Sequence, residues 1–307
     1  MNLKVLYLRI NKSCNAKCFM CDFWKNPKMD IKEEQFERVL EIVDGVKMIR
    51  FTGGEPLMCN KLPLYIQRCH TKGIKTSIIT NGLILNDEID NLVKCGLNQV
   101  VISVDASTPK LHDGLRRTPG LFAKIEKALD RISKEYPMTR TRVNTVVSEN
   151  NIHDLPQLAI WLDKHHVEQW SIIPVKLDGY RWSEKISSEE FKGRYTDFQK
   201  AVKNSNVTMM GYSASWVENI TEFWSGKSFI RPTGACHLSR MMSFYDPFTD
   251  HFYPCNCIPH RKLSFNSYVE ECLWYHKHGH EYCIGCEPLN AWCSDHPEKI
   301  DSDIFNF

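Results

Sequence analysis

The sequence lacks several features that would assign its class at once. No apolar run reaches the roughly 18 residues that a transmembrane helix needs. The first ten residues, MNLKVLYLRI, carry charges at Lys4 and Arg9 and are too short for the core of a secretory signal. These absences argue against membrane insertion and export, so we expect a cytoplasmic protein without a membrane partner.

An excess of charge of one sign is also lacking. Lys and Arg number 39 against 37 Asp and Glu, which gives a formal net charge of +2. A nucleic-acid-binding chain usually shows a basic excess, and a disordered one often carries a charged tract. We therefore expect no nucleic-acid partner and an ordinary globular chain, whose 307 residues can form a large domain and a small one.

Cysteine, by contrast, is abundant. The chain has 13 cysteines, and in a protein without an export signal these are better interpreted as metal ligands than as disulfides. Three lie within residues 14–21 and seven within 236–293, while Cys59, Cys69 and Cys95 are scattered. The two groups predict two metal sites at opposite ends of the chain.

Residues 1–175 alternate short apolar runs with amphipathic stretches, the pattern of a parallel βα repeat. We predict six strands, at 5–10, 47–53, 74–80, 99–105, 141–147 and 169–175. Helices are predicted around 36–43 and at 61–72, 86–95, 121–134 and 154–165. Six units are too few for a closed eight-stranded barrel, so the predicted fold is α/β, a partial (β/α)6 barrel with its chemistry at the carboxyl ends of the strands.

The composition changes twice further along. Residues 176–235 contain an amphipathic stretch near 187–203 but no further clear βα pair, and we interpret them as a bridging segment. Residues 236–307 are rich in cysteine, histidine and aromatic residues, as in a small domain held together by metal. The predicted domains are thus 1–175, 176–235 and 236–307.

The first cysteine group, Cys14-x3-Cys18-x2-Cys21, directly follows the first predicted strand. A zinc knuckle would need a fourth Cys or His nearby, and the next histidine is His70. The group resembles the signature of the radical S-adenosylmethionine (SAM) superfamily. The resemblance implies a [4Fe-4S] cluster on these three thiolates, with one iron left free to chelate SAM.

A second motif, Gly53-Gly54-Glu55-Pro56, follows the second predicted strand. Alone it would be a tight turn, but together with the cysteines it resembles the stretch that binds the amino group of SAM in this superfamily. Further matches at strand ends are Thr80, Asn81, Ser103, Asp105, Asn144 and Pro174. The resemblance implies that Ser103 and Asp105 lie near the ribose or methionine of SAM, Asn144 near the ribose and the sixth strand near the adenine; each could instead be a strand-end cap.

The stretch His112-Asp-Gly-Leu-Arg116-Arg117 resembles the HDxxR segment of the family. An arginine there could pair with the SAM carboxylate, and the alternative is a solvated helix face. One departure from the family is Met20, because an aromatic residue usually precedes the third cysteine.

The C-terminal group resembles the auxiliary-cluster module called SPASM/twitch, in its short form. The resemblance assigns a second [4Fe-4S] cluster to four ligands, Cys236, Cys255, Cys283 and Cys286. The first two should flank a β-hairpin. A zinc ribbon is the alternative. The spare cysteines are Cys257, Cys272 and Cys293, and the histidines His276, His278 and His280 are not predicted to be ligands.

The resemblance implies reductive cleavage of SAM and hydrogen abstraction by a 5′-deoxyadenosyl radical, with a flavodoxin- or ferredoxin-type electron donor. Because the first cysteine arrives at residue 14, before a peptide-recognition domain could fit, we expect a small polar substrate such as a sugar, aminocyclitol or nucleoside, and its oxidation. Alternatives are a peptide-modifying maturase, an epimerase with Cys257 or Cys293 as hydrogen donor, and a non-catalytic metal-binding scaffold.

Overall fold

The structure is a computed structural model that describes residues 4–43, 45–175, 185–209, 242–253 and 263–264. In this part of the chain, ten strands form one sheet in the order β10-β9-β8-β1-β2-β3-β4-β5-β6-β7. The seven strands from β1 to β7 are all parallel to their neighbours. The predicted α/β class with a mostly parallel sheet is therefore confirmed.

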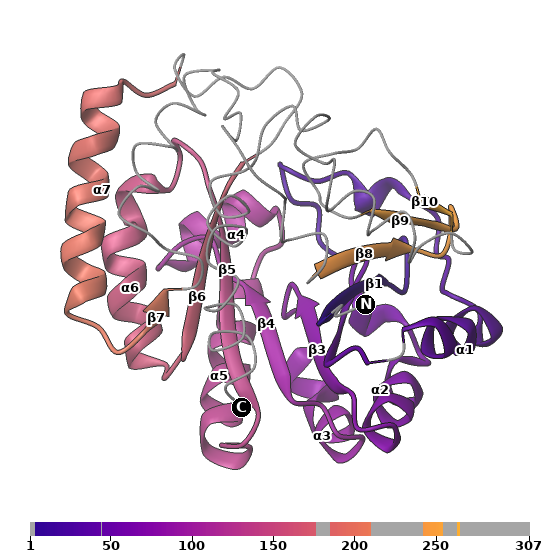
Figure 1. The fold of residues 1–307 in the computed structure, drawn as a ribbon. Coiled ribbons are helices and arrows are strands. Elements are labelled where there is room, and N and C mark those ends of the chain that lie inside the picture. Colours follow the sequence, from indigo (N-terminus) through magenta and orange to yellow (C-terminus); the bar gives the residue numbers. More distant parts are fainter. Residues whose placement is uncertain (1–3, 44, 176–184, 210–241, 254–262, 265–307) are drawn as a thin grey trace.

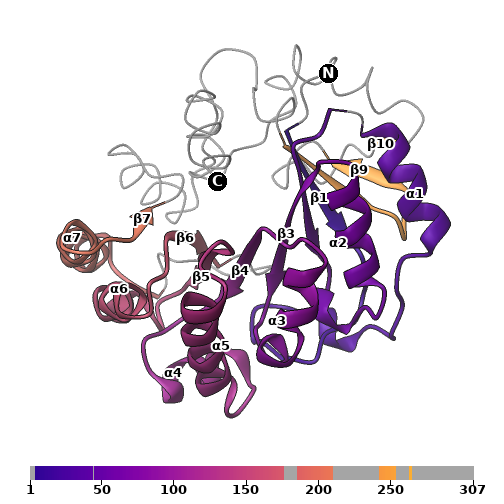
Figure 2. The same ribbon diagram turned by 90° about the horizontal axis from the view of Figure 1, so that it is seen from below.

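The six predicted strands are present and adjacent in chain order. They are β1 (Val5–Arg9), β2 (Met48–Thr52), β3 (Lys75–Thr80), β4 (Gln99–Ser103), β5 (Arg140–Val147) and β6 (Gln169–Pro174). The helices α1 (Glu33–Ile42), α2 (Leu62–Thr71), α3 (Leu85–Lys94), α4 (Pro109–Arg116), α5 (Leu121–Glu135) and α6 (Leu155–Lys164) connect them. These helices lie along one face of the curved sheet (Figure 1, Figure 2), as expected for a partial barrel.

The core lies between these helices and the sheet. Phe36 of α1 stacks on Tyr65 of α2 with ring centroids 4.2 Å apart, and its ring centroid lies 6.2 Å from that of Phe51 on β2. All three side chains are fully buried. Each such burial contributes about 1.5–3 kcal/mol, which explains why apolar residues at helical spacing predicted these helices.

The segment after β6 differs from expectation. Helix α7 (Ser188–Lys203) occupies the predicted amphipathic stretch and packs beside α6, and it is followed by β7 (Thr208–Met209), which pairs in parallel with β6. The prediction that no further βα pair follows residue 175 was wrong. A two-residue strand is too short to show a period-two pattern, so it left no signal in the sequence.

A hairpin predicted between Cys236 and Cys255 is present as β8 (Met242–Asp246) and β9 (His251–Tyr253). Strand β8 pairs in parallel with β1, and β10 (Leu263–Ser264) pairs with β9, so the hairpin extends the core sheet. Outside the described residues lie all the cysteines from Cys236 to Cys293, namely Cys236, Cys255, Cys257, Cys272, Cys283, Cys286 and Cys293, and His276, His278 and His280. The C-terminal domain and the three-domain division stay predictions.

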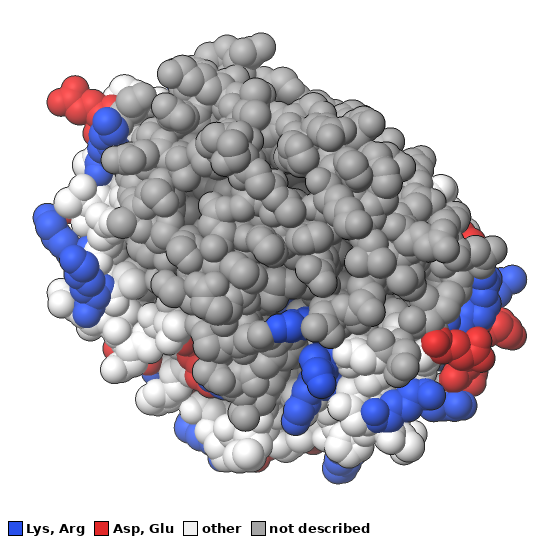
Figure 3. Space-filling view, viewed as in Figure 1, with Lys and Arg blue, Asp and Glu red and all other residues white. Residues whose placement is uncertain are grey.

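Charges on the described surface are mixed in sign. Near α1 and α2, acidic and basic side chains lie next to one another (Figure 3) in ion pairs that include Lys61–Glu33 and Arg68–Glu37. No helix in the described ranges has both the length and the apolar character needed to cross a bilayer.

Candidate functional site

The loop that carries the first three cysteines lies against the Gly53-Gly54 backbone. Gly54 N donates to Asn11 O at 3.2 Å, and Glu55 N donates to Ser13 O at 2.9 Å. A Cβ atom on Gly54 would overlap the Ser13 carbonyl group, and one on Gly53 would lie 2.6 Å from Asn11 O. Glycine is therefore required at both positions so that the two backbones can approach.

Glu55 connects the ends of β1, β2 and β3. Its carboxylate, which is almost fully buried, accepts hydrogen bonds from Thr80 Oγ1 at 2.6 Å, Asn81 N at 2.7 Å and Leu57 N at 3.1 Å. Asn11 Nδ2 donates to Glu55 O at 2.5 Å. Burial raises the pKa of Glu55 to about 7, although the three hydrogen bonds act in the opposite direction.

Cys14 lies beside neutral donors. Its Sγ is 3.5 Å from Ala16 N and 3.6 Å from Asn81 Nδ2, which also donates to Asn15 Oδ1 at 2.8 Å. Burial raises the pKa of the Cys14 thiol to about 11. A metal that binds this sulfur must therefore displace a tightly held proton.

Cys18 lies beside a cation. Arg116 Nη1 is 3.8 Å from Cys18 Sγ, and Arg116 Nε donates to Asp105 Oδ2 at 2.6 Å. The other carboxylate oxygen of Asp105 accepts from Val146 N at 2.8 Å. Burial raises the pKa of the Cys18 thiol, and the Arg116 charge opposes this increase.

Helix α4 carries three polar side chains with specific contacts, His112, Asp113 and Arg116, and the sequence predicted a role only for Arg116. His112 Nδ1 accepts a hydrogen bond from Asp105 N at 3.1 Å, so its proton is on Nε2, and burial lowers the pKa of His112 to about 4. Asp113 accepts from Gly120 N at 2.7 Å and Phe122 N at 2.8 Å, which caps α5. The signal for His112 was its i, i+4 spacing from Arg116, which places both on one helix face.

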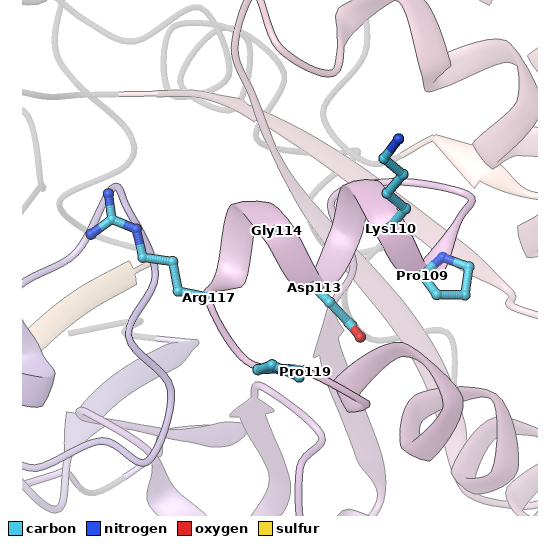
Figure 4. A pocket seen from close by; sticks show the side chains of 6 residues that line it. All are labelled: Pro109, Lys110, Asp113, Gly114, Arg117 and Pro119. Carbon is cyan, nitrogen blue, oxygen red and sulfur yellow. The ribbon is translucent and has the colours of Figure 1, made fainter.

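Arg117 does not contribute to this site. It is exposed, has a left-handed φ of 48°, and lines a shallow hollow of about 520 Å³ on the outside of α4 (Figure 4). The other residues that line this hollow are Pro109, Lys110, Asp113, Gly114 and Pro119. Of the two arginines, only Arg116 contacts the cysteine loop.

The remaining predicted positions lie at strand ends. Ser103 and Asn144 are partners in the register of β4 and β5, Pro56 begins a 3-10 helix, and Pro174 ends β6. Four polar atoms near the site are buried without a hydrogen-bond partner among the described residues, namely Asn11 Oδ1, Ser13 Oγ, His112 Nε2 and Asn144 Oδ1. Because such atoms are costly to leave unpaired, they are suitable places for a bound polar ligand.

The three cysteines of the loop supply the thiols that a [4Fe-4S] cluster requires. Cys14, Cys18 and Cys21 are free thiols, and Cys21 N donates to Cys18 O at 3.3 Å. Within the described ranges, no three His, Cys, Asp or Glu side chains converge where one metal ion would bind. A zinc knuckle needs that convergence, whereas the thiolates of a four-iron cluster each bind a different iron.

The described chain thus combines a mostly parallel α/β sheet with a loop of three free cysteines after its first strand. Residues 8–162, about half of the chain, match the family model of the radical SAM superfamily. The protein belongs to this superfamily, whose members are enzymes that use a [4Fe-4S] cluster and SAM.

Relatives include the probable GTP 3′,8-cyclase of Methanococcus vannielii, 27% identical over 60% of this chain and 68% of that protein. The GTP 3′,8-cyclase of Chlorobaculum tepidum is 32% identical over 52% of this chain and 50% of that protein. The chain thus spans 68% of the length of the first relative and half of the length of the second.

The fold is also similar to that of Streptococcus suis SuiB in a crystal structure with bound S-adenosylmethionine. The TM-score is 0.65 at 16% identity, over 94% of this chain and 72% of SuiB. A second SuiB structure contains the precursor peptide SuiA, with a TM-score of 0.64 at 18% identity, over 95% of this chain and 71% of SuiB. At these identities the likeness shows the fold alone.

Proposed function

We propose that Cys14, Cys18 and Cys21 hold an open [4Fe-4S] cluster and that the chain cleaves SAM to abstract hydrogen from a small polar substrate. The observation that supports this most strongly is a loop of three free thiols that follows β1 and is anchored by Asn11 and Ser13 against the Gly53-Gly54 backbone. The bound cluster supplies one-electron reductive cleavage of SAM to methionine and a 5′-deoxyadenosyl radical.

The residues around the cysteine loop would bind SAM or position the loop. The Gly53–Pro56 backbone would bind the amino group of SAM, as its resemblance to the superfamily motif implies. Ser103 and Asn144 would bind the ribose, and the unpaired Asn144 Oδ1 supports this role. Thr80 and Asn81 would position the loop through Glu55 and Cys14. Both carboxylate oxygens of Asp105 already have partners, so we assign it to Arg116 rather than to SAM.

A nucleoside-type substrate is the most specific member of the proposed class. The support is that both relatives described above, at 27% and 32% identity, are named for GTP. A peptide substrate is the second candidate, because a protein of similar fold, SuiB, has been solved with its precursor peptide SuiA.

We propose oxidation as the reaction and a second [4Fe-4S] cluster on Cys236, Cys255, Cys283 and Cys286. That cluster would supply an acceptor for the second electron removed from the substrate. The support within the described residues is the β8–β9 hairpin, which follows Cys236 and precedes Cys255 in the chain. Cys257 and Cys293 are the hydrogen-donor candidates if the reaction is instead an epimerisation.

The central proposal is tested with Cys14, Cys18 and Cys21 changed together to alanine. Anaerobically reconstituted wild-type protein should hold about eight irons per chain and the variant about four. The variant should form no 5′-deoxyadenosine with SAM and dithionite, whereas wild type should. Formation of 5′-deoxyadenosine by the variant would contradict the proposal. Cys283→Ala should lower the iron content while SAM cleavage persists, and zinc in place of iron there would remove the electron-acceptor role.

The reaction type is tested in D2O with nucleosides, nucleotides and short peptides as substrates. An oxidised product should lack two electrons relative to substrate and carry no solvent deuterium at the abstracted position. One deuterium in the product, lost in Cys257→Ala or Cys293→Ala, would indicate epimerisation instead.

A further inference from the structure

The two cysteines at the start of the loop have different electrostatic environments. Cys14 Sγ contacts the neutral donors Ala16 N and Asn81 Nδ2. Cys18 Sγ contacts Arg116 Nη1 at 3.8 Å, and Arg116 as a whole is 7% exposed. Among the described residues that contact these two sulfurs, Arg116 is the one that carries a formal positive charge.

Arg116 is held in place from several directions. Its Nε donates to Asp105 Oδ2 at 2.6 Å, while Asp105 Oδ1 accepts from Val146 N. The backbone of Asp105 is also held. Asp105 N donates to His112 Nδ1 at 3.1 Å, and Asn151 Nδ2 donates to Asp105 O at 2.7 Å. Asp105 is completely buried, so this is a rigid ion pair with its positive end toward Cys18.

We propose that Arg116 is a positioning residue that sets the reduction potential of the cluster on Cys18, and that Asp105 holds its guanidinium at the sulfur. The proposal rests on the proposed function, because it takes Cys18 as a cluster ligand. It adds that Arg116 acts on the cluster before SAM binds, through its charge and its N–H···S contact.

The physical reason is the charge of the two redox states. Reduction adds one electron to the cluster, so a nearby positive charge stabilises the reduced state and raises the potential. Hydrogen bonds to cluster sulfurs act in the same direction. Because the guanidinium is buried, neither water nor salt screens it as at the surface. Asp105 reduces the effect, since its negative charge is paired with the guanidinium and partly cancels the positive charge.

This arrangement predicts shifts of opposite sign for two neighbouring substitutions. Arg116→Gln removes the cation and leaves the Asp105 carboxylate, so the potential should become more negative. Asp105→Asn leaves the cation without its counter-charge, so the potential should become more positive. A residue that only maintained the fold would not produce opposite shifts.

The experiment is a redox titration by electron paramagnetic resonance of the anaerobically reconstituted full chain without SAM. The signal to follow is the one that the triple cysteine variant lacks. Arg117→Gln is the matched control, because it removes an exposed arginine next in the chain and should leave the potential unchanged. Arg116→Lys keeps the charge but loses the planar donor, so its potential should lie between those of wild type and Arg116→Gln.

Single substitutions leave one buried charge unpaired and can prevent folding. The double variant Arg116→Gln/Asp105→Asn avoids this, and its potential should still be more negative than that of wild type. Iron content and thermal unfolding report whether each variant is folded and loaded.

Equal potentials in folded Arg116→Gln, the double variant and Arg117→Gln would overturn the proposal. A tenfold or greater loss of SAM affinity in Arg116→Gln with an unchanged SAM-free potential would also overturn it and make Arg116 a SAM ligand. In both cases the proposed function would stand, since neither result bears on whether Cys14, Cys18 and Cys21 hold the cluster or whether wild type cleaves SAM.

Discussion

The two sides of the cysteine loop are held by different kinds of interaction. On the Cys14 side, backbone contacts to Gly53 and Gly54 and a buried carboxylate, Glu55, join the ends of three strands. On the Cys18 side, a buried ion pair between Arg116 and Asp105 reaches the sulfur. The Cys14 side therefore determines where the loop lies, and the Cys18 side determines the charge it experiences.

The two sides of the loop differ because one is held by backbone contacts and the other by a long charged side chain. Close approach between two backbones requires glycine and tolerates no side chain, so the Cys14 side is sensitive to volume. A guanidinium on α4 reaches across to the loop through a long side chain, so the Cys18 side is sensitive to charge. Substitutions of each kind should separate the two sides.

The largest effect on iron content and SAM cleavage should come from Gly54→Ala on the Cys14 side. The added Cβ overlaps the Ser13 carbonyl group, so the loop must move, at a cost of about 1–3 kcal/mol for the overpacked backbone. We expect loss of about four irons per chain and of SAM cleavage.

Gly193→Ala is the matched control for that change. Gly193 is exposed within α7, and a Cβ atom there meets nothing within 4 Å. Alanine should stabilise this helix by about 0.5–1 kcal/mol and leave the iron content unchanged. Normal cluster loading in Gly54→Ala would show that the backbone contact is dispensable.

The next effect concerns pH. Folding raises the pKa of Glu55 from 4.5 to about 7, so the folded state binds this proton more tightly than the unfolded state. The resulting stabilisation is complete below about pH 4.5 and is lost as the pH rises to about 7, a change of about 3 kcal/mol. Denaturant unfolding of the metal-free protein at several pH values should show this slope.

Glu55→Gln should lack the slope, because glutamine does not titrate. The exposed Glu189→Gln makes the same change on α7 and should retain the wild-type slope. An identical pH dependence in wild type and Glu55→Gln would assign the titration to another group.

A smaller effect should come from Asp113→Ala near the Cys18 side. The carboxylate accepts from Gly120 N and Phe122 N, so its loss should destabilise the protein by about 1 kcal/mol, as for other helix caps. Thermal unfolding would measure this cost. The reduction potential of the cluster should not change, since Asp113 braces α5 and does not contact Cys18. If Asp113→Ala shifted the reduction potential as much as Arg116→Gln does, the potential would not depend specifically on the charge of Arg116.

The smallest effect should be that of Asn81→Ala on the potential. Its side chain donates to Cys14 Sγ at 3.6 Å and carries no charge, so its loss should lower the potential less than Arg116→Gln does. The same titration measures both variants. If Asn81→Ala lowered the reduction potential more than Arg116→Gln does, the Cys14 side rather than the Cys18 side would have the stronger influence on the potential.

Much of the fold could be predicted from the sequence because its signals are local. Phe36, Val39 and Val43 recur at helical spacing, and the parallel strands contain short apolar runs, such as Val5–Leu8 in β1. The helix α4 was missed because Pro109 and Gly114 interrupt the pattern, and β7 because it is only two residues long. The cysteine loop and the Gly53-Gly54 stretch were found because motif spacing is a property of the chain itself.

The sequence by itself thus determined the order of strands and helices and the cysteine loop, since periodicity and spacing depend only on neighbouring residues. The tertiary structure decided which distant groups meet: β8 beside β1, Asp105 with Arg116, and Arg116 rather than Arg117 at Cys18. The reason is that a strand edge and a buried charge each accept the partner that folding brings within reach. Two adjacent arginines are equivalent in the sequence until the helix turns one inward and leaves the other in water.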